Sequence, residues 1–123
     1  MSTPTTQSTG FDVAGFVRAI ESRNAGAQLA AFGPDPLVTI VDHEHPPSRP
    51  LTMHGTTEVR TYLADVCDRD LTHEVQTAVA DHDNLTVELL CTYPDGTKVN
   101  CLSIAGLADG QIAWQRIVQA WDH

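Results

Sequence analysis

Residues 55–66, GTTEVRTYLADV, decide the fold class of this 123-residue chain together with the segment that follows them. That segment is long and has no helical spacing. The apolar side chains of residues 55–66 are spaced three and four residues apart, the period of an amphipathic helix. These side chains are Val59, Tyr62, Leu63 and Val66. Glu58 falls in the first turn, where the helix dipole favours an anion. The pattern predicts a helix over residues 56–68.

From Leu71 onward, apolar and polar residues alternate with the period of two that is typical of half-buried strands. Dipeptides that favour tight turns interrupt the alternation at Asp83-Asn84, Asp95-Gly96 and Asp109-Gly110. The sequence therefore predicts a meander of four antiparallel strands. These strands cover residues 71–82, 85–93, 98–108 and 111–121.

Ahead of the 56–68 helix, the chain predicts two more helices and one strand. Residues 12–23 show helical spacing, and a shorter helix is expected over residues 27–32. Residues 37–41 are rich in β-branched side chains and predict a strand, after which three prolines indicate an irregular loop. This order of elements indicates an α+β fold with helices on one face of a curved antiparallel sheet.

The amino-acid composition argues against several classes of function. The formal net charge is −9, from 16 acidic and 7 basic residues, so the chain repels nucleic acid and anionic membranes. No apolar run reaches the about 18–20 residues of a membrane helix, so we expect a soluble protein. Residues 1–10 read as a flexible tail without a secretion signal, and residues 11–123 as one cytoplasmic domain.

Five motifs carry a resemblance to a known family: GTTEVRTYLADV (55–66), THEV (72–75), YPDGTKV (93–99), DGQI (109–112) and VQAW (118–121). Together with the order of elements, they resemble the nuclear transport factor 2-like (NTF2-like, SnoaL-like) family over about residues 11–122. The resemblance implies a cone-shaped fold, with three N-terminal helices packed on a strongly curved antiparallel sheet. It also implies an apolar pocket and a homodimer through the convex sheet face.

The resemblance carries candidate roles for several residues. Isomerases of this fold place a general-base aspartate in the region of Asp42, and a protonated acid near Ser103, where serine is a weaker donor. Steroid isomerisation is therefore disfavoured. The resemblance also favours an inward orientation for Gln115, Gln119 and Trp121, which would form a surface that orients a ligand.

The stretch Asp42-His43-Glu44-His45 concentrates four titratable side chains at the end of the predicted strand. In an extended chain, His43 and His45 share one face and the two carboxylates share the other. A histidine can take and give a proton near neutral pH. The alternatives are a solvated strand end, or a metal site that would need His54 or His73 as further ligands; we expect no metal.

His73 is expected on the same strand face as Val75 and Val79, either as a core histidine or as a pocket wall. Cys91 and Cys101 should be neighbours across the hairpin. No base lies near them in sequence, so packing is their expected role and we expect all cysteines reduced. The opposite strand face carries Leu102 and Ile104 and suits a second subunit.

We therefore expect a protein that binds a small, partly apolar or aromatic molecule. It would be a cofactor-independent acid/base enzyme of the polyketide cyclase, isomerase or dehydratase type, since no cofactor motif is present. His45 or Asp42 is the expected base, and His73 the expected acid. The expected substrate-binding residues are His43, Tyr62, Cys101, Ser103, Gln115, Gln119 and Trp121. The alternative is a non-catalytic ligand-binding or protein-interaction domain of the same fold.

Overall fold

The computed structural model describes residues 10–122, which form three helices and six strands. In chain order these are α2 (Val13–Glu21), α3 (Ala25–Ala30), β1 (Phe32–Val41), β2 (Leu51–His54), α4 (Thr56–Asp68), β3 (Thr72–Ala80), β4 (Asn84–Thr92), β5 (Lys98–Ala108) and β6 (Gln111–Trp121). Apart from Gly10, the tail expected over residues 1–10 lies outside the described residues. Within residues 10–122, no helix has the length and apolar character needed to cross a bilayer.

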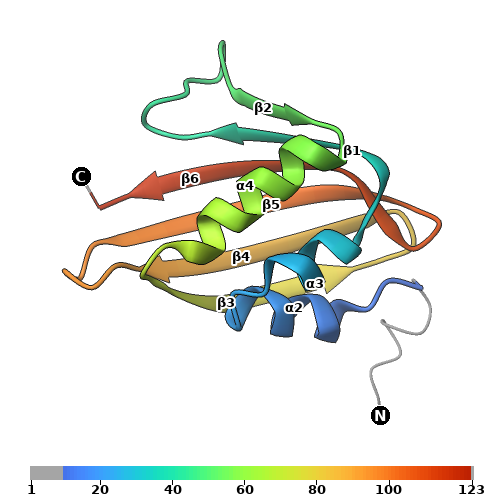
Figure 1. The fold of residues 1–123 in the computed structure, drawn as a ribbon, viewed down its shortest axis with the longest axis horizontal. Coiled ribbons are helices and arrows are strands. Elements are labelled where there is room, and N and C mark those ends of the chain that lie inside the picture. The colour runs from blue at the N-terminus through green and yellow to red at the C-terminus, as the bar shows by residue number, and fades with distance from the viewer. Residues whose placement is uncertain (1–9, 123) are drawn as a thin grey trace.

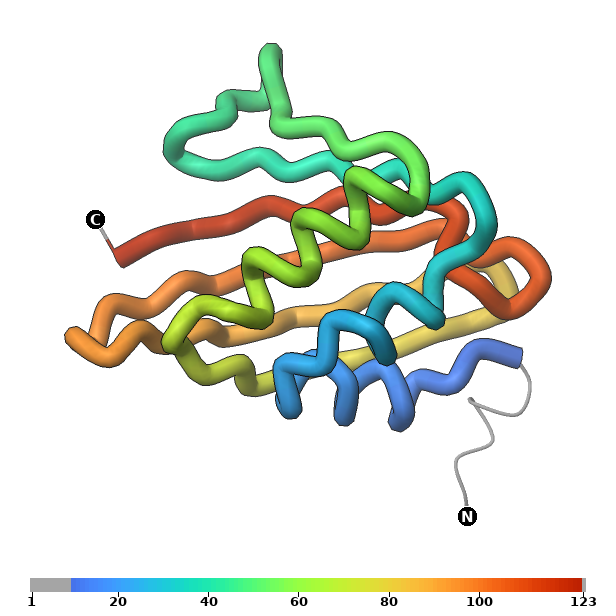
Figure 2. Tube along the Cα trace, viewed as in Figure 1, coloured from blue at the N-terminus to red at the C-terminus, as the bar shows by residue number. Residues whose placement is uncertain are grey.

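All six strands belong to one sheet, in the order β2-β1-β6-β5-β4-β3. The pairing is antiparallel except between β1 and β6, which run parallel. Figure 1 shows the three helices on the same face of this sheet, and Figure 2 shows α4 crossing the strands at an angle. The α+β fold with three helices on a sheet is confirmed, and the sheet is mostly antiparallel.

Helices α2 and α3 begin where a side chain can accept a hydrogen bond from a backbone N–H group of the first turn. Asp12 Oδ1 accepts from the Gly15 N–H at 2.9 Å, and Asn24 Oδ1 accepts from Ala27 at 3.0 Å, so both residues are N-caps. Helix α4 has the predicted bounds, and Glu58 in its first turn accepts from the His54 N–H at 2.7 Å. Capping side chains therefore determine where α2 and α3 start.

Two strands differ from the prediction because of the prolines around them. β1 starts at Phe32 and not at residue 37; its pairing with β6 is irregular between Phe32 and Leu37, so Pro34 and Pro36 do not interrupt a regular ladder. The short strand β2 was not predicted. It pairs with β1 at the edge of the sheet, where the proline-rich loop returns the chain.

The prediction that Cys91 and Cys101 are neighbours across the β4–β5 hairpin is confirmed. Val87, Leu89 and Cys91 of β4 pair with Ser103, Cys101 and Val99 of β5, as the turn at residues 93–97 predicts. In β3, however, a bulge shifts the register between Val75 and Thr77. The expectation that Val79 shares a face with His73 is therefore wrong, and the Val79 side chain is 59% exposed.

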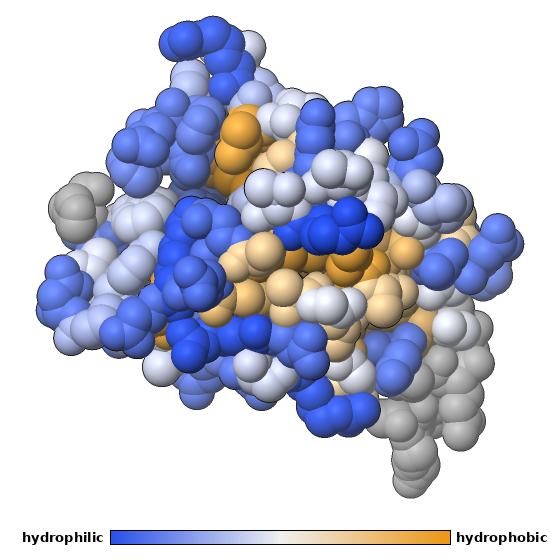
Figure 3. All heavy atoms as spheres, in the orientation of Figure 1, coloured by the Kyte–Doolittle hydropathy of each residue, from blue (hydrophilic) through white to orange (hydrophobic). Residues whose placement is uncertain are grey.

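The core lies between the helices and the sheet. Helix α2 packs on β3, and α3 packs against α4. Figure 3 views this helix-covered face, where hydrophobic residues appear near its middle with hydrophilic residues around them. The largest fully buried side chains include Val38, Val59, Leu85 and Ile112. The same layer contains the cavity described below.

Replacing Gly55 with alanine is expected to lower the free energy of unfolding by about 1–3 kcal/mol. Gly55 has φ 90° and ψ 163°, which side chains disfavour, although a Cβ there would meet no atom within 4 Å. Gly26→Ala is the matched control, since Gly26 lies inside α3 and its Cβ would make an ordinary contact. Alanine there should stabilise by about 0.5–1 kcal/mol. Urea unfolding of both variants measures these opposite signs; equal effects would contradict the argument.

Candidate functional site

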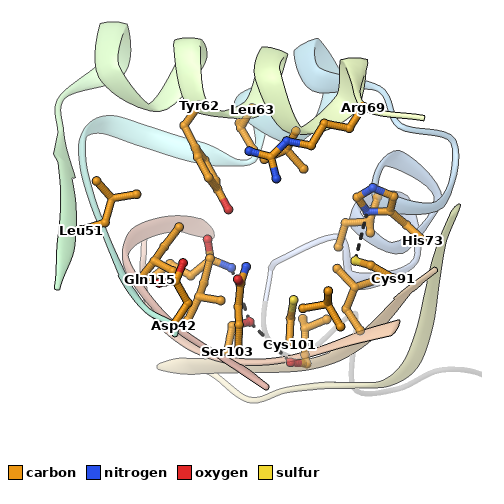
Figure 4. A pocket seen from close by; sticks show the side chains of 18 of the residues that line it. Asp42, Leu51, Tyr62, Leu63, Arg69, His73, Cys91, Cys101, Ser103 and Gln115 are labelled. Atoms are coloured by element: carbon orange, nitrogen blue, oxygen red, sulfur yellow. Dashed lines mark hydrogen bonds between the residues drawn. The ribbon is translucent and has the colours of Figure 1, made fainter. Parts of the chain in front are cut away.

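A cavity of about 360 Å³ lies between α4 and the inner face of the sheet (Figure 4). Its volume falls in the range of about 300–1,000 Å³ that is common for small-molecule sites. Apolar side chains, among them Phe16, Ile40, Leu63 and Val99, form much of its wall. All ten predicted site residues line it: Asp42, His43, His45, Tyr62, His73, Cys101, Ser103, Gln115, Gln119 and Trp121.

Asp42 and His45 form a compact turn on the cavity wall. β1 ends at Val41, and the backbones of Asp42 and His45 exchange hydrogen bonds of 3.0 and 3.2 Å. The expected extended conformation, with Asp42 and His45 on opposite faces, is therefore wrong. Asp42 Oδ1 accepts from the backbone N–H groups of Glu44 (2.9 Å) and His45 (2.8 Å), and it lies 2.9 Å from His45 Nδ1.

These hydrogen bonds favour the ionised form of Asp42 and one tautomer of His45. Burial alone would raise the pKa of Asp42, but the hydrogen bond from the His45 ring and the two backbone N–H groups hold it below its usual range. An ionised carboxylate only accepts hydrogen bonds, so His45 Nδ1 carries the proton that faces Asp42. The second ring nitrogen, Nε2, is then the basic atom of His45.

The lowered pKa of Asp42 has a consequence for stability. A carboxylate whose pKa is lower in the folded protein stabilises it above its unfolded pKa, about 3.9, and this contribution disappears as the pH falls through the folded value. The Asp42 side chain is 14% exposed, so screening by solvent is limited. Asp42→Asn should therefore lower the urea unfolding free energy near about pH 7 more than near about pH 3. A constant difference across this range would contradict the assignment.

Polar groups on the other walls of the cavity come from α4, β5 and β6. The Tyr62 hydroxyl points into the cavity from α4 (Figure 4). Burial, together with the nearby Cys101 thiol, raises the pKa of Tyr62, so the hydroxyl keeps its proton at neutral pH. Gln115 Nε2 donates to Ser103 Oγ at 3.4 Å. Tyr62 is therefore positioned as a hydrogen-bond donor to a bound molecule.

At the edge of the same wall, aromatic rings surround Trp121. Trp121 Nε1 donates to Gln119 Oε1 at 3.2 Å. The rings of His43 and Tyr93 lie with their centroids 4.8 and 5.9 Å from that of Trp121. These contacts hold a flat apolar surface next to one amide group, an arrangement suited to an aromatic or cyclic ligand.

His73 lies in the cavity wall opposite Asp42, as Figure 4 shows. It is 8% exposed, and its Nδ1 lies 4.0 Å from Cys91 Sγ. Among the described residues, its Nε2 is buried without a hydrogen-bond partner, which costs about 1–3 kcal/mol. The structure thus places a base beside Cys91, although sequence proximity offered none.

Arg69 and Tyr93 are among the residues of the cavity wall that the sequence did not predict as site residues. Arg69 follows α4 directly, and its guanidinium donates to Asp65 at 2.7 Å while reaching the cavity (Figure 4). Its backbone carbonyl accepts from Arg23 at 2.6 Å, which fixes the segment leading into β3. An arginine at a helix end gives no periodic signal, so its inward orientation was not predictable.

The histidines and carboxylates do not assemble into a metal site within residues 10–122, where no group of three suitable side chains meets. His54, a possible further ligand, lies outside the cavity wall and pairs with Asp35 at 3.5 Å on the surface. The three cysteines, Cys67, Cys91 and Cys101, are free.

The family is decided by a match of residues 13–115 to the model of the SnoaL-like domain. This chain belongs to the SnoaL-like domain family. Among solved structures, an NTF2-like protein of unknown function from Mesorhizobium loti matches this SnoaL-like chain with a TM-score of 0.75 at 13% identity. The match covers 98% of this chain and 96% of that protein.

Two further structures that are similar to this SnoaL-like domain belong to proteins described by an activity. A putative ketosteroid isomerase from Kribbella flavida has 16% identity and a TM-score of 0.69, covering 98% of this chain and 83% of that one. The epoxide hydrolase/cyclase-like enzyme SalBIII, described in pyran ring formation in the polyether salinomycin, has 20% identity and a TM-score of 0.65, covering 88% and 87%. At these identities the likeness shows the NTF2-like fold. A search of the curated proteins found no match.

Proposed function

We propose that this protein is a cofactor-independent acid/base enzyme that removes a proton from carbon next to a carbonyl group, in an isomerase-, cyclase- or dehydratase-type reaction. The observation that carries the proposal is the 2.9 Å contact of Asp42 with His45 on the wall of an apolar cavity. A base oriented by a carboxylate in such a cavity is the arrangement that proton abstraction requires. The neighbouring isomerase and cyclase-like structures are consistent with this chemistry.

In the proposed step, His45 Nε2 takes the α-proton, and the electron pair of the broken C–H bond moves to the carbonyl oxygen. Asp42 positions the ring through Nδ1 and stabilises the imidazolium that forms. The Tyr62 hydroxyl donates a hydrogen bond to the enolate oxygen. Tyr62 lies close enough to Asp42 for that charge to raise its pKa further. His45 later returns the proton to another carbon or to a leaving hydroxyl.

The side chains that line the cavity indicate the class of substrate. Trp121, with His43 and Tyr93 beside it, offers a ring-sized apolar surface, and Gln119 and the Ser103–Gln115 pair offer hydrogen bonds. We propose that the substrate is a cyclic or aromatic ketone, which is enclosed in a cone-shaped pocket.

We also propose that the protein is cytoplasmic. Its free cysteines are consistent with this location.

Solvent exchange tests this function without knowledge of the natural substrate. The protein is incubated in D₂O with a panel of aryl and cyclic ketones, such as 1-indanone and 2-tetralone, and loss of the α-proton signal is followed by NMR. Exchange above the buffer rate for at least one ketone is the expected result. Binding of these ketones, seen as shifts of protein resonances, without exchange at any pH would instead support the alternative of a non-catalytic ligand-binding domain.

We also propose a homodimer through the outer face of β5 and β6. Leu102, Ile104 and Val118 are exposed there, with Arg116 beside Ile104 and Glu88 beside Leu102. Because β4 and β6 flank β5, a twofold axis parallel to β5 would bring Glu88 of one copy toward Arg116 of the second copy. Leu102→Glu should convert the dimer to a monomer in analytical ultracentrifugation, and an unchanged sedimentation coefficient would contradict this interface.

A further inference from the structure

His73 and Cys91 lie at the end of the cavity opposite Asp42, with Cys101 between them and Ser103, and the proposed proton transfer uses none of these three side chains (Figure 4). His73 on β3 pairs directly with Cys91 on β4, and Cys101 on β5 lies one diagonal step further. Three neighbouring strands thus present one imidazole and two thiols on the same wall. None of the described cysteines forms a disulfide.

The contacts of Cys91 are those of a reactive thiol. Its Sγ lies 4.0 Å from His73 Nδ1, a hydrogen-bond contact that can shorten when a ligand fills the cavity. The hydrogen bond from the Cys101 thiol lowers the pKa of Cys91 against the opposing effect of burial, and His73 and the charge of Arg69 lower it further. Cys67 on α4 differs, because burial raises its pKa and its sulfur accepts from Gln28.

The His73 ring itself is unusual for a packing residue. It is buried, and within the described part of the chain its Nε2 has no hydrogen-bond partner. Buried polar atoms in a core are nearly always paired, so an unpaired one next to a thiol and a cavity points to a ligand-directed role. An imidazole held against a thiol is the pair that activates cysteine nucleophiles.

We propose that Cys91, with His73 as its base, captures an α,β-unsaturated carbonyl compound covalently in this cavity. The thiol proton moves to His73 Nδ1, and Sγ forms a bond to the β-carbon of the ligand. The electron pair of the carbon–carbon double bond moves through the α-carbon to the carbonyl oxygen, giving an enolate. The proton on His73 then goes to the α-carbon, so the product is a thioether and nothing is oxidised or released.

An α,β-unsaturated carbonyl compound suits both the thiol of Cys91 and the apolar wall of the cavity. A thiolate is a soft nucleophile that adds readily to a conjugated carbon, and the apolar wall accepts the hydrocarbon part. The proposal needs the cavity to admit the unsaturated ketone, but it does not depend on proton abstraction by His45. The two proposals therefore fail independently: labelling at Cys91 without ketone exchange supports only this one, and exchange without labelling supports only the proposed function.

The test uses the full chain and cyclohex-2-enone as the probe. Intact-mass spectrometry measures the rate of adduct formation, and peptide mapping locates the adduct. We expect one added molecule on Cys91, formed at least about tenfold faster than on Cys67, and no fast phase in Cys91→Ser. An adduct formed first on Cys67 or Cys101, or no adduct, would overturn the proposal.

The role of His73 is tested separately. His73→Asn should slow labelling of Cys91 by about tenfold or more, because the thiol loses its base. If this variant does not fold, labelling of the native chain is compared with labelling in urea, where all three cysteines should react at similar rates. Preference for Cys91 in the folded state alone supports the proposal; equal preference in both states, or an unchanged rate in a folded His73→Asn, contradicts it.

Discussion

His45→Asn is expected to lower the rate of ketone α-proton exchange by about 10²–10⁴-fold, the usual contribution of a general base. Asparagine retains an N–H group that can donate to Asp42, but it has no basic nitrogen. The fold should therefore survive while proton removal is lost. The measurement is the exchange rate by NMR at several pH values, together with the thermal unfolding midpoint.

The variant Asp42→Asn tests how much the positioning of the His45 ring contributes, separately from proton abstraction by that ring. The base remains, but the imidazolium formed in the reaction loses its charged hydrogen-bond partner. A hydrogen bond to a charged group contributes about 1.5–3 kcal/mol, which corresponds to a loss of about 10–100-fold. The exchange rate of this variant should thus lie between those of the wild type and His45→Asn.

His54→Asn is the matched control for both variants. His54 lies outside the cavity wall and pairs with Asp35 at the surface, so its replacement should leave exchange unchanged. Exchange that persists in a folded His45→Asn, or that falls equally in His54→Asn, would rule out His45 as the base.

Sequence patterns predicted the fold where the determining contacts are local. The period of α4 and the turn dipeptides gave the bounds of α4, β5 and β6 correctly. The missed features depend on distant partners. β2 is a four-residue strand that exists through its pairing with β1, and the bulge in β3 depends on the register with β4. Neither leaves a periodic signal in its own segment.

For the site, alternation grouped Gln115, Gln119 and Trp121 on one face of β6, and the family resemblance favoured that face as the inner one; all three line the cavity. Contacts between side chains were harder to predict from the sequence. The Asp42–His45 hydrogen bond requires the chain to turn directly after β1, and an extended reading separated the two residues. The contact between His73 and Cys91 joins residues 18 positions apart and needs the β3–β4 register. Strand faces were predictable where no bulge intervenes, but these two pairs were not.

The second large expected effect is on stability. Leu85→Ala should lower the free energy of unfolding by about 2–5 kcal/mol, measured by urea denaturation. Leu85 is 1% exposed, and its cross-strand neighbours are Ala80 on β3 and Ala105 on β5. The substitution would therefore leave three alanines in a row across the sheet. Neither neighbour has a longer side chain that could move into the space left by the leucine.

Val79→Ala is the control on β3, since this side chain is 59% exposed and its loss should change stability by no more than about 0.5 kcal/mol. The position of Leu85 decides the size of the expected loss, because a cavity costs more where the surroundings cannot collapse. Leu85 is paired with Ala80 of β3 and Ala105 of β5, and the β4–β5 ladder has no register shift, so the sheet resists such movement. A loss for Leu85→Ala no larger than that for Val79→Ala would mean that the helices settle onto the sheet, and that this part of the core is not rigidly packed.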